Sequence, residues 1–370
     1  MTAPPLDRAS RLRSVGAVLP PYRYDQTELT TMFLDILGEQ DIHPEVVRRT
    51  HANAGVSQRH LAIPAERYAA LEDFGAANDA FIEAAVELGA AAMLDALSQA
   101  ELTPSDVDLV MSTTVTGLAV PSLEARIAAR IGLRPDVKRV PLVGLGCVAG
   151  AAGVARVHDY LLGHPQDVAV LVAVELCSLT VQRDDASMAN VVASGLFGDG
   201  AAAVVLTGAE REAPSPSTSP GSDVVVVESR SRMYAGTERA MGWDIGQTGL
   251  KIVLGAEVPG LVLANLRGDV DGFLADHGLT RDDIGWWVAH PGGPKVLEAM
   301  QDALEVPREA LGMTWSSLDR IGNLSSASVL HVLADTLRDR PPVPGTHGML
   351  LAMGPGFCLE MVLLHAEESR

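Results

Sequence analysis

The chain has 370 residues, of which 47% are hydrophobic and 20% are charged. This composition is typical of a folded protein with sizeable cores, and it excludes a disordered chain. The formal net charge of -19 disfavours nucleic acid and anionic membrane surfaces as partners. No apolar run reaches the roughly 20 residues that a membrane-spanning helix needs.

The N-terminal segment, residues 1–20, lacks the apolar core and the cleavage site of a signal peptide. The three cysteines, Cys147, Cys177 and Cys358, are far apart and include no CxxC pair. This pattern disfavours a disulfide framework or a metal site such as zinc. Together these features predict a cytoplasmic protein.

The first candidate binding patch along the chain comprises Arg48, Arg49, Arg59 and His60. In so acidic a protein, any anionic ligand needs a local basic site, and this cluster could supply one. The alternative is a scattered set of solvated arginines.

The next informative segment leads to Cys147. A buried strand predicted at 139–143 runs through glycines into a helix that begins at or just after this cysteine. The positive end of a helix dipole favours the thiolate, so the position suits a nucleophile. The alternative is a small buried core cysteine, which is common.

A continuous apolar strand is predicted at 168–175 (VAVLVAVE), and such strands belong to sheets that helices cover on both faces. Residues 210–223 (EREAPSPSTSPGSD) are too rich in Pro, Ser and Gly for a packed element, so we interpret them as a linker. The linker divides the chain into an N-terminal half, 1–209, and a C-terminal half, 224–370.

Two polar residues stand out in the C-terminal half. His290 ends the predicted strand IGWWVAH and precedes Pro-Gly-Gly-Pro, a strand tip that is a usual place for an active-site group. A histidine that is merely hydrogen-bonded in a turn is the alternative. Asn323 opens a helix of small residues, where it is either an N-cap or an amide donor in a site.

The two halves repeat each other. Residues 103–117 resemble 280–293 at an offset of 177, and a small-residue helix and a glycine turn with a strand follow in both halves. This internal duplication predicts an α/β fold, a five-layer αβαβα sandwich in which the strand-to-helix turns of both halves converge. Cys147, His290 and Asn323 could then share one cavity, although such a set alone does not decide between acyl transfer and hydrolysis.

Five motifs resemble one known family over nearly the whole chain: GLGCVAGAAG, GLFGDGAAAVV, WWVAHPGGPKVLE, GNLSSASVL and MGPGF. The sequence resembles the chalcone and stilbene synthase family of type III polyketide synthases. The resemblance implies a thiolase fold, a homodimer, acyl-CoA and malonyl-CoA as substrates, and no metal or organic cofactor.

The resemblance also implies roles for single residues. Cys147 would be the nucleophile and acyl carrier, and His290 would form an ion pair with its thiolate. His290 and Asn323 would stabilise the thioester oxyanion and the enolate, and one such donor typically contributes about 3 kcal/mol. Phe197 matches the gatekeeper phenylalanine of the family. Arg49 aligns with a CoA-binding residue, whereas Asn53 replaces a lysine of the plant enzymes.

In the family, further positions line the substrate cavity. Trp243 replaces a glycine of the plant enzymes and Ile252 replaces a phenylalanine. Three small residues resemble those that open a tunnel for a fatty acyl chain in bacterial alkylpyrone and alkylresorcinol synthases, although a tightly packed core is the alternative. The full set of predicted cavity residues is Thr116, Ala119, Cys177, Thr180, Ala193, Trp243, Ile252, Met353 and Pro355.

These residues favour a synthase that loads a medium- or long-chain acyl-CoA on Cys147, extends it with malonyl-CoA and closes an alkyl-α-pyrone or alkylresorcinol. One alternative is a malonyl-only synthase that makes tetrahydroxynaphthalene. A second is a ketoacyl synthase III, which condenses once onto acyl carrier protein and which the MGPGF ending disfavours. A third is an inactive thiolase-fold partner subunit, which would usually have lost the nucleophile.

Overall fold

The computed structural model describes residues 8–38, 42–212 and 224–368. The strands are β1 (Ser10–Val18), β2 (Tyr22–Asp25), β3 (Gln58–Leu61), β4 (Leu109–Thr113), β5 (Lys138–Leu142), β6 (Val168–Leu176), β7 (Asp199–Thr207), β8 (Val224–Met233), β9 (Met241–Gly246), β10 (Gly249–Leu254), β11 (Ile284–Ala289), β12 (His347–Gly354) and β13 (Cys358–Ala366). The α-helices are α1 (Gln26–Leu37), α2 (Pro44–Ala52), α3 (Phe74–Gln99), α4 (Leu123–Ile131), α5 (Ala149–Gly163), α6 (Met188–Leu196), α7 (Val258–Ala275), α8 (Pro294–Leu304), α9 (Gly312–Ile321) and α10 (Ser328–Asp339).

The main sheet has the strand order β11-β12-β13-β8-β1-β7-β6-β4-β5. Its N-terminal part holds the parallel strands β5, β4 and β6, and its C-terminal part holds the parallel pair β11 and β12. The two parts join only where β1 pairs with β8 over three residues, Ser10–Leu12 opposite Val224–Val226. The sheet is therefore two half-sheets with a short seam, one from each half of the chain.

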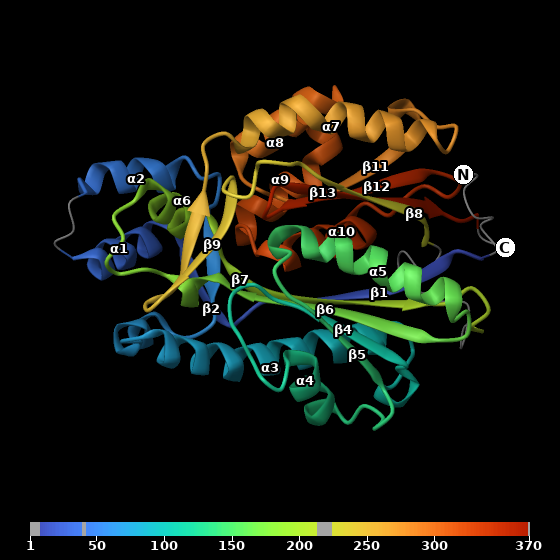
Figure 1. Ribbon diagram of the computed structural model, residues 1–370, viewed down its shortest axis with the longest axis horizontal. Helices are drawn as coiled ribbons and strands as arrows, with labels where there is room; N and C mark the ends of the chain where they lie inside the picture. Colours follow the sequence, from blue (N-terminus) through green and yellow to red (C-terminus); the bar gives the residue numbers. More distant parts are fainter. Residues whose placement is uncertain (1–7, 39–41, 213–223, 369–370) are drawn as a thin grey trace.

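Helices cover both half-sheets on both faces, as the continuous apolar strands predict (Figure 1). One apolar core lies between α3, α4 and the N-terminal half-sheet, and another lies between α7, α8 and the C-terminal half-sheet. A third core surrounds α5 and α10, which lie between the two half-sheets. The five-layer thiolase-like fold expected from the sequence is thus confirmed.

The duplicated segments adopt the same local structures. A short 3-10 helix with a capping box precedes β4 at η3 (Pro104–Asp106) and β11 at η6 (Arg281–Asp283). In the middle layer, η4 (Gly146–Val148) leads into α5 and η8 (Ser325–Ala327) leads into α10. The two turns pack against each other, and Gly150 of α5 lies so close to the carbonyl of Ser326 that no side chain would fit.

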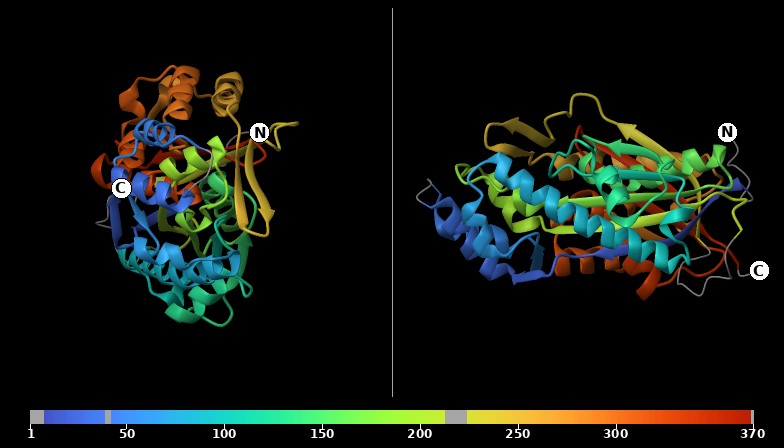
Figure 2. Two further views of the ribbon diagram at one scale, coloured as in Figure 1. Left: turned by 90° about the vertical axis from the view of Figure 1, so that its left-hand side faces the viewer. Right: turned by 90° about the horizontal axis from the view of Figure 1, so that it is seen from below.

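The remaining elements gather at one end of the sandwich, where α1, α2, α6, the two-stranded sheet β2–β3 and the hairpin β9–β10 lie (Figures 1 and 2). These elements cover the end of the sandwich at which β6 ends and β7 begins. Most of the predicted linker, residues 213–223, lies outside the described residues. None of the described helices combines the length and the apolar character that a membrane crossing requires.

Candidate active site

Cys147 lies in η4, directly before the first turn of α5. The residue is half-buried, and its Sγ donates a hydrogen bond of 3.5 Å to the hydroxyl of Ser325. Burial, the largest cause, raises the pKa of the thiol to about 12; the bond to Ser325 lowers it and the Glu175 carboxylate raises it. Desolvation thus opposes the thiolate, and the expectation that the helix N-terminus favours the thiolate stays a prediction.

Asn323 lies in a short parallel bridge with Phe197. Its backbone N–H donates to the carbonyl of Leu196 and its own carbonyl accepts from Gly198, both at 2.9 Å. The side-chain oxygen accepts from the N–H of Ser325 at 2.8 Å and from the hydroxyl of Ser328 at 3.3 Å. These bonds fix the amide plane, so that the side-chain N–H2 remains the donor that a ligand could use. Ser325 thereby links Asn323 to Cys147.

His290 follows the last residue of β11, and its backbone N–H donates to Leu351 of β12 at 2.8 Å. The ring is buried, and its Nδ1 has no hydrogen-bond partner among the described residues. Burial alone lowers the pKa of this imidazole to about 3, so that the ring is neutral at pH 7. The turn after His290 approaches Leu196, since a Cβ added to Gly293 would lie 3.4 Å from the side chain of Leu196. The carbonyl of Leu196 accepts the hydrogen bond from the backbone N–H of Asn323.

The turns that carry Cys147 and Asn323 thus contact each other, whereas no hydrogen bond joins His290 to Cys147 in the described part of the chain. Burial favours the neutral form of both groups. The ion pair implied by the resemblance therefore stays a prediction. A neutral thiol can still react where a neutral imidazole takes its proton as the sulfur attacks a carbonyl carbon.

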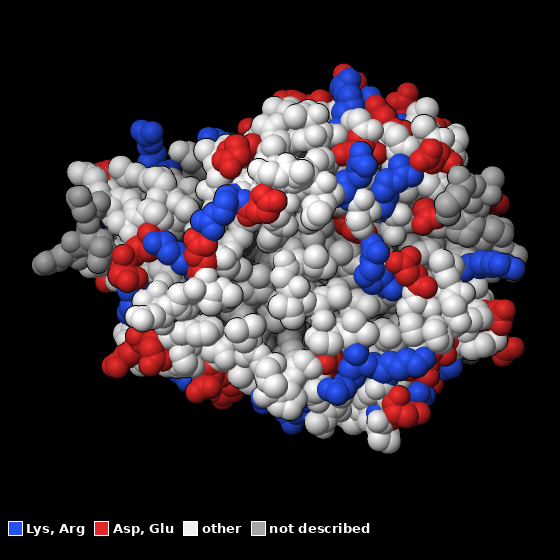
Figure 3. Space-filling model, viewed as in Figure 1, with Lys and Arg blue, Asp and Glu red and all other residues white. Residues whose placement is uncertain are grey.

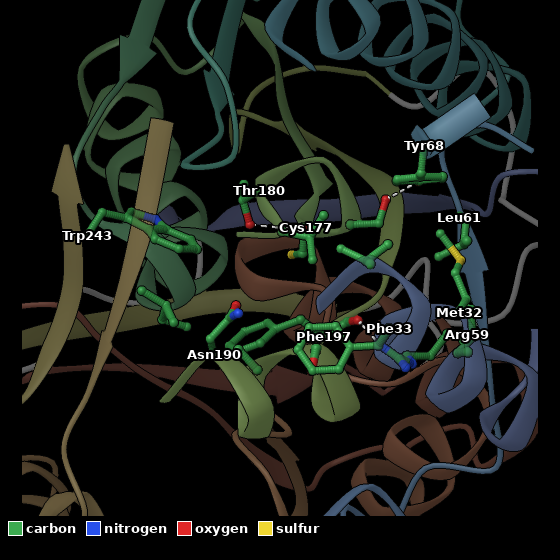
Figure 4. Close-up of a pocket in the computed structure, with 17 residues that line it drawn as sticks. Met32, Phe33, Arg59, Leu61, Tyr68, Cys177, Thr180, Asn190, Phe197 and Trp243 are labelled. Atoms are coloured by element: carbon green, nitrogen blue, oxygen red, sulfur yellow. Dashed lines mark hydrogen bonds between the residues drawn. The ribbon is translucent and has the colours of Figure 1, made fainter. Parts of the chain in front are cut away.

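A cavity of about 670 Å³, counting space open to solvent, lies beside this region (Figure 4). Its walls come from α1, α6, the turn after β6 and the β9–β10 hairpin, where Trp243 and Ile252 are cross-strand partners. Phe197 contributes to the wall while its backbone bridges Asn323, which is the place expected of a gate. Six of the predicted cavity and gate residues line this space: Cys177, Thr180, Ala193, Phe197, Trp243 and Ile252.

The other predicted cavity residues lie elsewhere. Thr116 lines a second cavity of about 970 Å³, which shares Thr180 with the first. Ala119 lies in the loop before α4 and lines neither of these two cavities, and the fatty acyl tunnel stays a prediction. Met353 and Pro355 lie at the end of β12, where Pro355 packs on Gly146 beside Cys147.

The candidate basic patch is not one surface cluster. Arg59 is buried, and Arg48 is engaged with Glu45 on the exposed side of α2. The ring of His60 bonds the carbonyl of Pro20. Arg49 is exposed on α2, and its role in CoA binding stays a prediction. The grouping of these residues from sequence was wrong because Arg59, in the short strand β3, faces inward.

Sequence analysis missed a buried carboxylate in this region. Glu175 has no exposed surface, and burial raises its pKa. It accepts hydrogen bonds from the backbone N–H of Val115 and the hydroxyl of Thr116 on one side, and from the hydroxyl of Ser326 on the other. A lone acidic residue at the end of the apolar run VAVLVAVE was the signal that could have revealed it.

Among the described residues, no group of three or more His, Cys, Asp or Glu side chains is placed to hold a metal ion. Two family models match the chain: FAE1/Type III polyketide synthase-like protein over residues 26–219, and the C-terminal domain of chalcone and stilbene synthases over residues 226–367. Their boundary falls in the predicted linker.

Individual relatives agree with these matches. A 1,3,6,8-tetrahydroxynaphthalene synthase of Streptomyces peucetius subsp. caesius is 53% identical and covers 97% of this chain and 94% of its own. The α-pyrone synthesis polyketide synthase-like Pks18 of Mycobacterium tuberculosis is 31% identical over 76% of this chain and 71% of its own. The crystal structure of tetrahydroxynaphthalene synthase from Streptomyces coelicolor A3(2) superposes with a TM-score of 0.89 at 28% identity, covering 97% of this chain and 100% of that one. This chain belongs to the chalcone and stilbene synthase family of type III polyketide synthases, and it is an acyltransferase.

Proposed function

We propose that this enzyme makes 1,3,6,8-tetrahydroxynaphthalene from malonyl-CoA alone. The observation that carries the proposal is the 53% identity to the Streptomyces peucetius synthase over 97% of the chain. The ten skeleton carbons of the product are five two-carbon units, which five malonyl groups supply when each loses CO2. This proposal reverses the order of the two sequence-based interpretations, since the acyl-primed synthase becomes the second candidate.

In the proposed reaction, the thiol of Cys147 attacks the carbonyl carbon of the malonyl thioester and its proton passes to His290, which burial keeps neutral beforehand. The bond from that carbon to the sulfur of coenzyme A breaks, and coenzyme A leaves as the free thiol with the proton that His290 returns. Loss of CO2 from the next malonyl-CoA places negative charge on a carbonyl oxygen. Asn323 donates to that oxygen through its side-chain nitrogen, whose plane is fixed by Ser325 and Ser328. Phe197 excludes water from the thioester, which would otherwise hydrolyse.

The second candidate is priming by an aliphatic acyl-CoA with closure to an alkyl-α-pyrone or alkylresorcinol. The specific observation in its favour is the apolar part of the wall of the cavity in Figure 4 that α1 supplies, with Leu29, Met32, Phe33 and Ile36. Such a wall suits an alkyl chain, since burying each CH2 group contributes about 0.8 kcal/mol.

The decisive experiment incubates the purified enzyme with malonyl-CoA alone and identifies products by mass spectrometry, with Cys147→Ala as the blank. Tetrahydroxynaphthalene formation without any other starter is the expected result. Acyl-CoAs of increasing length are then added in competition. If malonyl-CoA alone yields no aromatic product but an acyl-CoA yields a pyrone or resorcinol, the second candidate replaces the first.

The homodimer remains a proposal, and surface chemistry supports it. Val120 is 94% exposed and Leu118 is 48% exposed, although Asn78 fixes their loop through two bonds to the backbone of Leu118. The middle of the face in Figure 3 is largely free of charged side chains, although Arg156 and Asp159 are exposed on α5 beside it. Val120→Asp should shift sedimentation towards the monomer, whereas Leu263→Asp, on α7 at 50% exposure, should not. A monomeric native enzyme would overturn this proposal.

A further inference from the structure

The C-terminal end of α6 is held by two side chains from the N-terminal region. The last carbonyls of a helix have no partner within the helix and need one elsewhere. Gln26 donates its side-chain N–H to the carbonyl of Gly195, and Arg59 donates from Nη1 to the carbonyl of Phe197, both at 2.6 Å. Arg59 also donates from Nη2 to the side-chain oxygen of Gln26 at 2.9 Å. We call Gln26 and Arg59 the α6 clamp.

The α6 clamp is buried, with Arg59 4% exposed and Gln26 9% exposed. Burial lowers the pKa of Arg59 to about 10, which leaves the guanidinium charged at neutral pH. A positive charge beside the C-terminal end of a helix is favourable because of the helix dipole. The planar guanidinium reaches the Phe197 carbonyl and the Gln26 oxygen at once, which a lysine ammonium on its flexible stem would do less rigidly.

The aliphatic stem of Arg59 lies beside Gly322, the residue before Asn323. A Cβ added to Gly322 would lie 3.1 Å from the stem and 2.7 Å from the carbonyl of Leu196. Gly322 has a φ of +73°, so a side chain there would also be strained. The stem therefore fills the space beside the residue that precedes Asn323, while the head of Arg59 holds Phe197. Figure 4 shows Arg59 next to Phe197 at the cavity wall.

We propose that Arg59, supported by Gln26, is a positioning residue that fixes the bridge between Phe197 and Asn323. The bridge consists of the bonds from Gly198 N–H to Asn323 and from Asn323 N–H to Leu196. The roles of Phe197 as gate and Asn323 as amide donor rest on the proposed function. Arg59 touches no reacting atom, but it sets where two such residues stand. A misplacement of about 1 Å at such a donor can cost about a hundredfold in rate.

The test compares Arg59→Met, Arg59→Lys and a matched control, Arg267→Met. Arg267 also donates to a backbone carbonyl in the last turn of a helix, that of Ala303 in α8, but far from this site. Hydrogen–deuterium exchange resolved to single amides reads the bridge directly. We expect the amides of Gly198 and Asn323 to exchange at least about tenfold faster in Arg59→Met, less so in Arg59→Lys, and unchanged in Arg267→Met.

Activity gives the second measurement. We expect Arg59→Met to lower kcat for malonyl-CoA consumption about a hundredfold with KM changed less than about threefold, and Arg59→Lys to restore part of kcat. Unchanged exchange at both amides together with unchanged kcat would overturn the proposal. Exchange that rises equally at all amides would also overturn it, because that result marks a merely structural arginine.

The exchange measurement needs no substrate, so it separates this proposal from the proposed function. A native enzyme that makes no product from malonyl-CoA would refute the function and leave the exchange test of Arg59 intact. If Arg59→Met does not fold, Gln26→Met provides the same test through the other member of the clamp. Unchanged exchange at Gly198 and Asn323 in that variant would overturn the proposal.

Discussion

The turn at η4 with α5 and the turn at η8 with α10 are two copies of one unit whose chemistry has diverged. At the offset of 177 residues, Cys147 corresponds to Leu324 and Asn323 corresponds to Gly146. Each copy therefore supplies one reactive group and leaves the matching position inert. Leu324 is fully buried in the core, whereas Cys147 is half-buried. The scaffold tolerates both because a short 3-10 helix and small residues such as Gly150 form much of the contact between the copies.

The strand ends show the same division. Glu175 at the end of β6 corresponds to Ala352 in β12, and His290 after β11 corresponds to Thr113 in β4. Glu175 bonds Thr116 in its own half and Ser326 in the other. It therefore connects the turn after β4 with η8. A duplicated fold thus gains a mixed site when each half keeps different polar residues at equivalent positions.

The largest effect is expected when the nucleophile, which only one of the two copies carries, is removed. Cys147→Ala should lower product formation more than about a thousandfold, since removing a nucleophile removes the whole covalent route. Cys358→Ala is the matched control, because Cys358 is also a free, half-buried cysteine. The control should retain activity within about threefold. Turnover by the Cys147 variant at the native rate would refute the assignment of the nucleophile.

The next effect concerns the tie between the halves. Glu175→Gln replaces one acceptor oxygen with an N–H2 group, which must then face hydrogen-bond donors from Val115 and Thr116 or from Ser326. We expect a loss of about 2 kcal/mol in the free energy of unfolding, measured by urea denaturation. The exposed Glu238 gives the control substitution, Glu238→Gln, which should change stability by less than about 0.5 kcal/mol. Equal stability of the two variants would show that the carboxylate does not tie the turns.

A third test compares the middle-layer helices through pH. His331 of α10 corresponds to Val154 of α5, and its ring bonds the carbonyl of Ala201 on β7 at 3.0 Å. Burial lowers its pKa to about 4, and Arg320 and His60 act in the same direction, whereas Asp335 and the bond to Ala201 raise it. A histidine with a lowered folded-state pKa contributes stability that is present above about pH 6.5 and is lost as pH falls towards 4.

His331→Gln keeps a donor for the carbonyl but removes this titration. Between pH 7 and pH 5, the variant should therefore lose about 2 kcal/mol less than the native enzyme, because one histidine contributes up to about 1.4 kcal/mol per pH unit. His51 and His290 also have lowered pKa values, but they are common to both proteins. Parallel curves for the variant and the native enzyme would contradict the prediction.

Much of the fold could be predicted from sequence because the duplication repeats local signals. The polar caps at Thr103 and Thr280 and the apolar runs after them fixed β4 and β11. The strand expected at 139–143 was found one residue earlier, at Lys138–Leu142, but its expected burial was wrong, because β5 lies at the edge of the main sheet and is largely exposed. The pairing of β1 with β8 could not be predicted, since it joins residues more than half the chain apart without any local signal.

The site was less predictable, because its properties depend on burial. The position of Cys147 at a helix start follows from its neighbours, but the direction of its pKa depends on how closely η8 and Glu175 approach. Arg59 looks like a surface residue by its type, and only the tertiary structure shows that it faces α6. The placement of Thr116 and Cys177 in different cavities likewise depends on the turn after β6.

The smallest expected effect on stability concerns the caps of η3 and η6, where the two copies are most alike. Thr103 and Thr280 each cap a 3-10 helix through the same pair of bonds to Asp106 and Asp283. Thr103→Ala and Thr280→Ala should each cost about 1 kcal/mol in unfolding free energy, the usual loss for a cap. Because the two caps lie in different outer parts of the sandwich, the double variant should lose the sum of the two values. A clearly unequal pair would mean that the two copies have diverged in stability as well as in chemistry, and the additional bond of Thr103 to the hydroxyl of Ser105 is a local difference that could cause this.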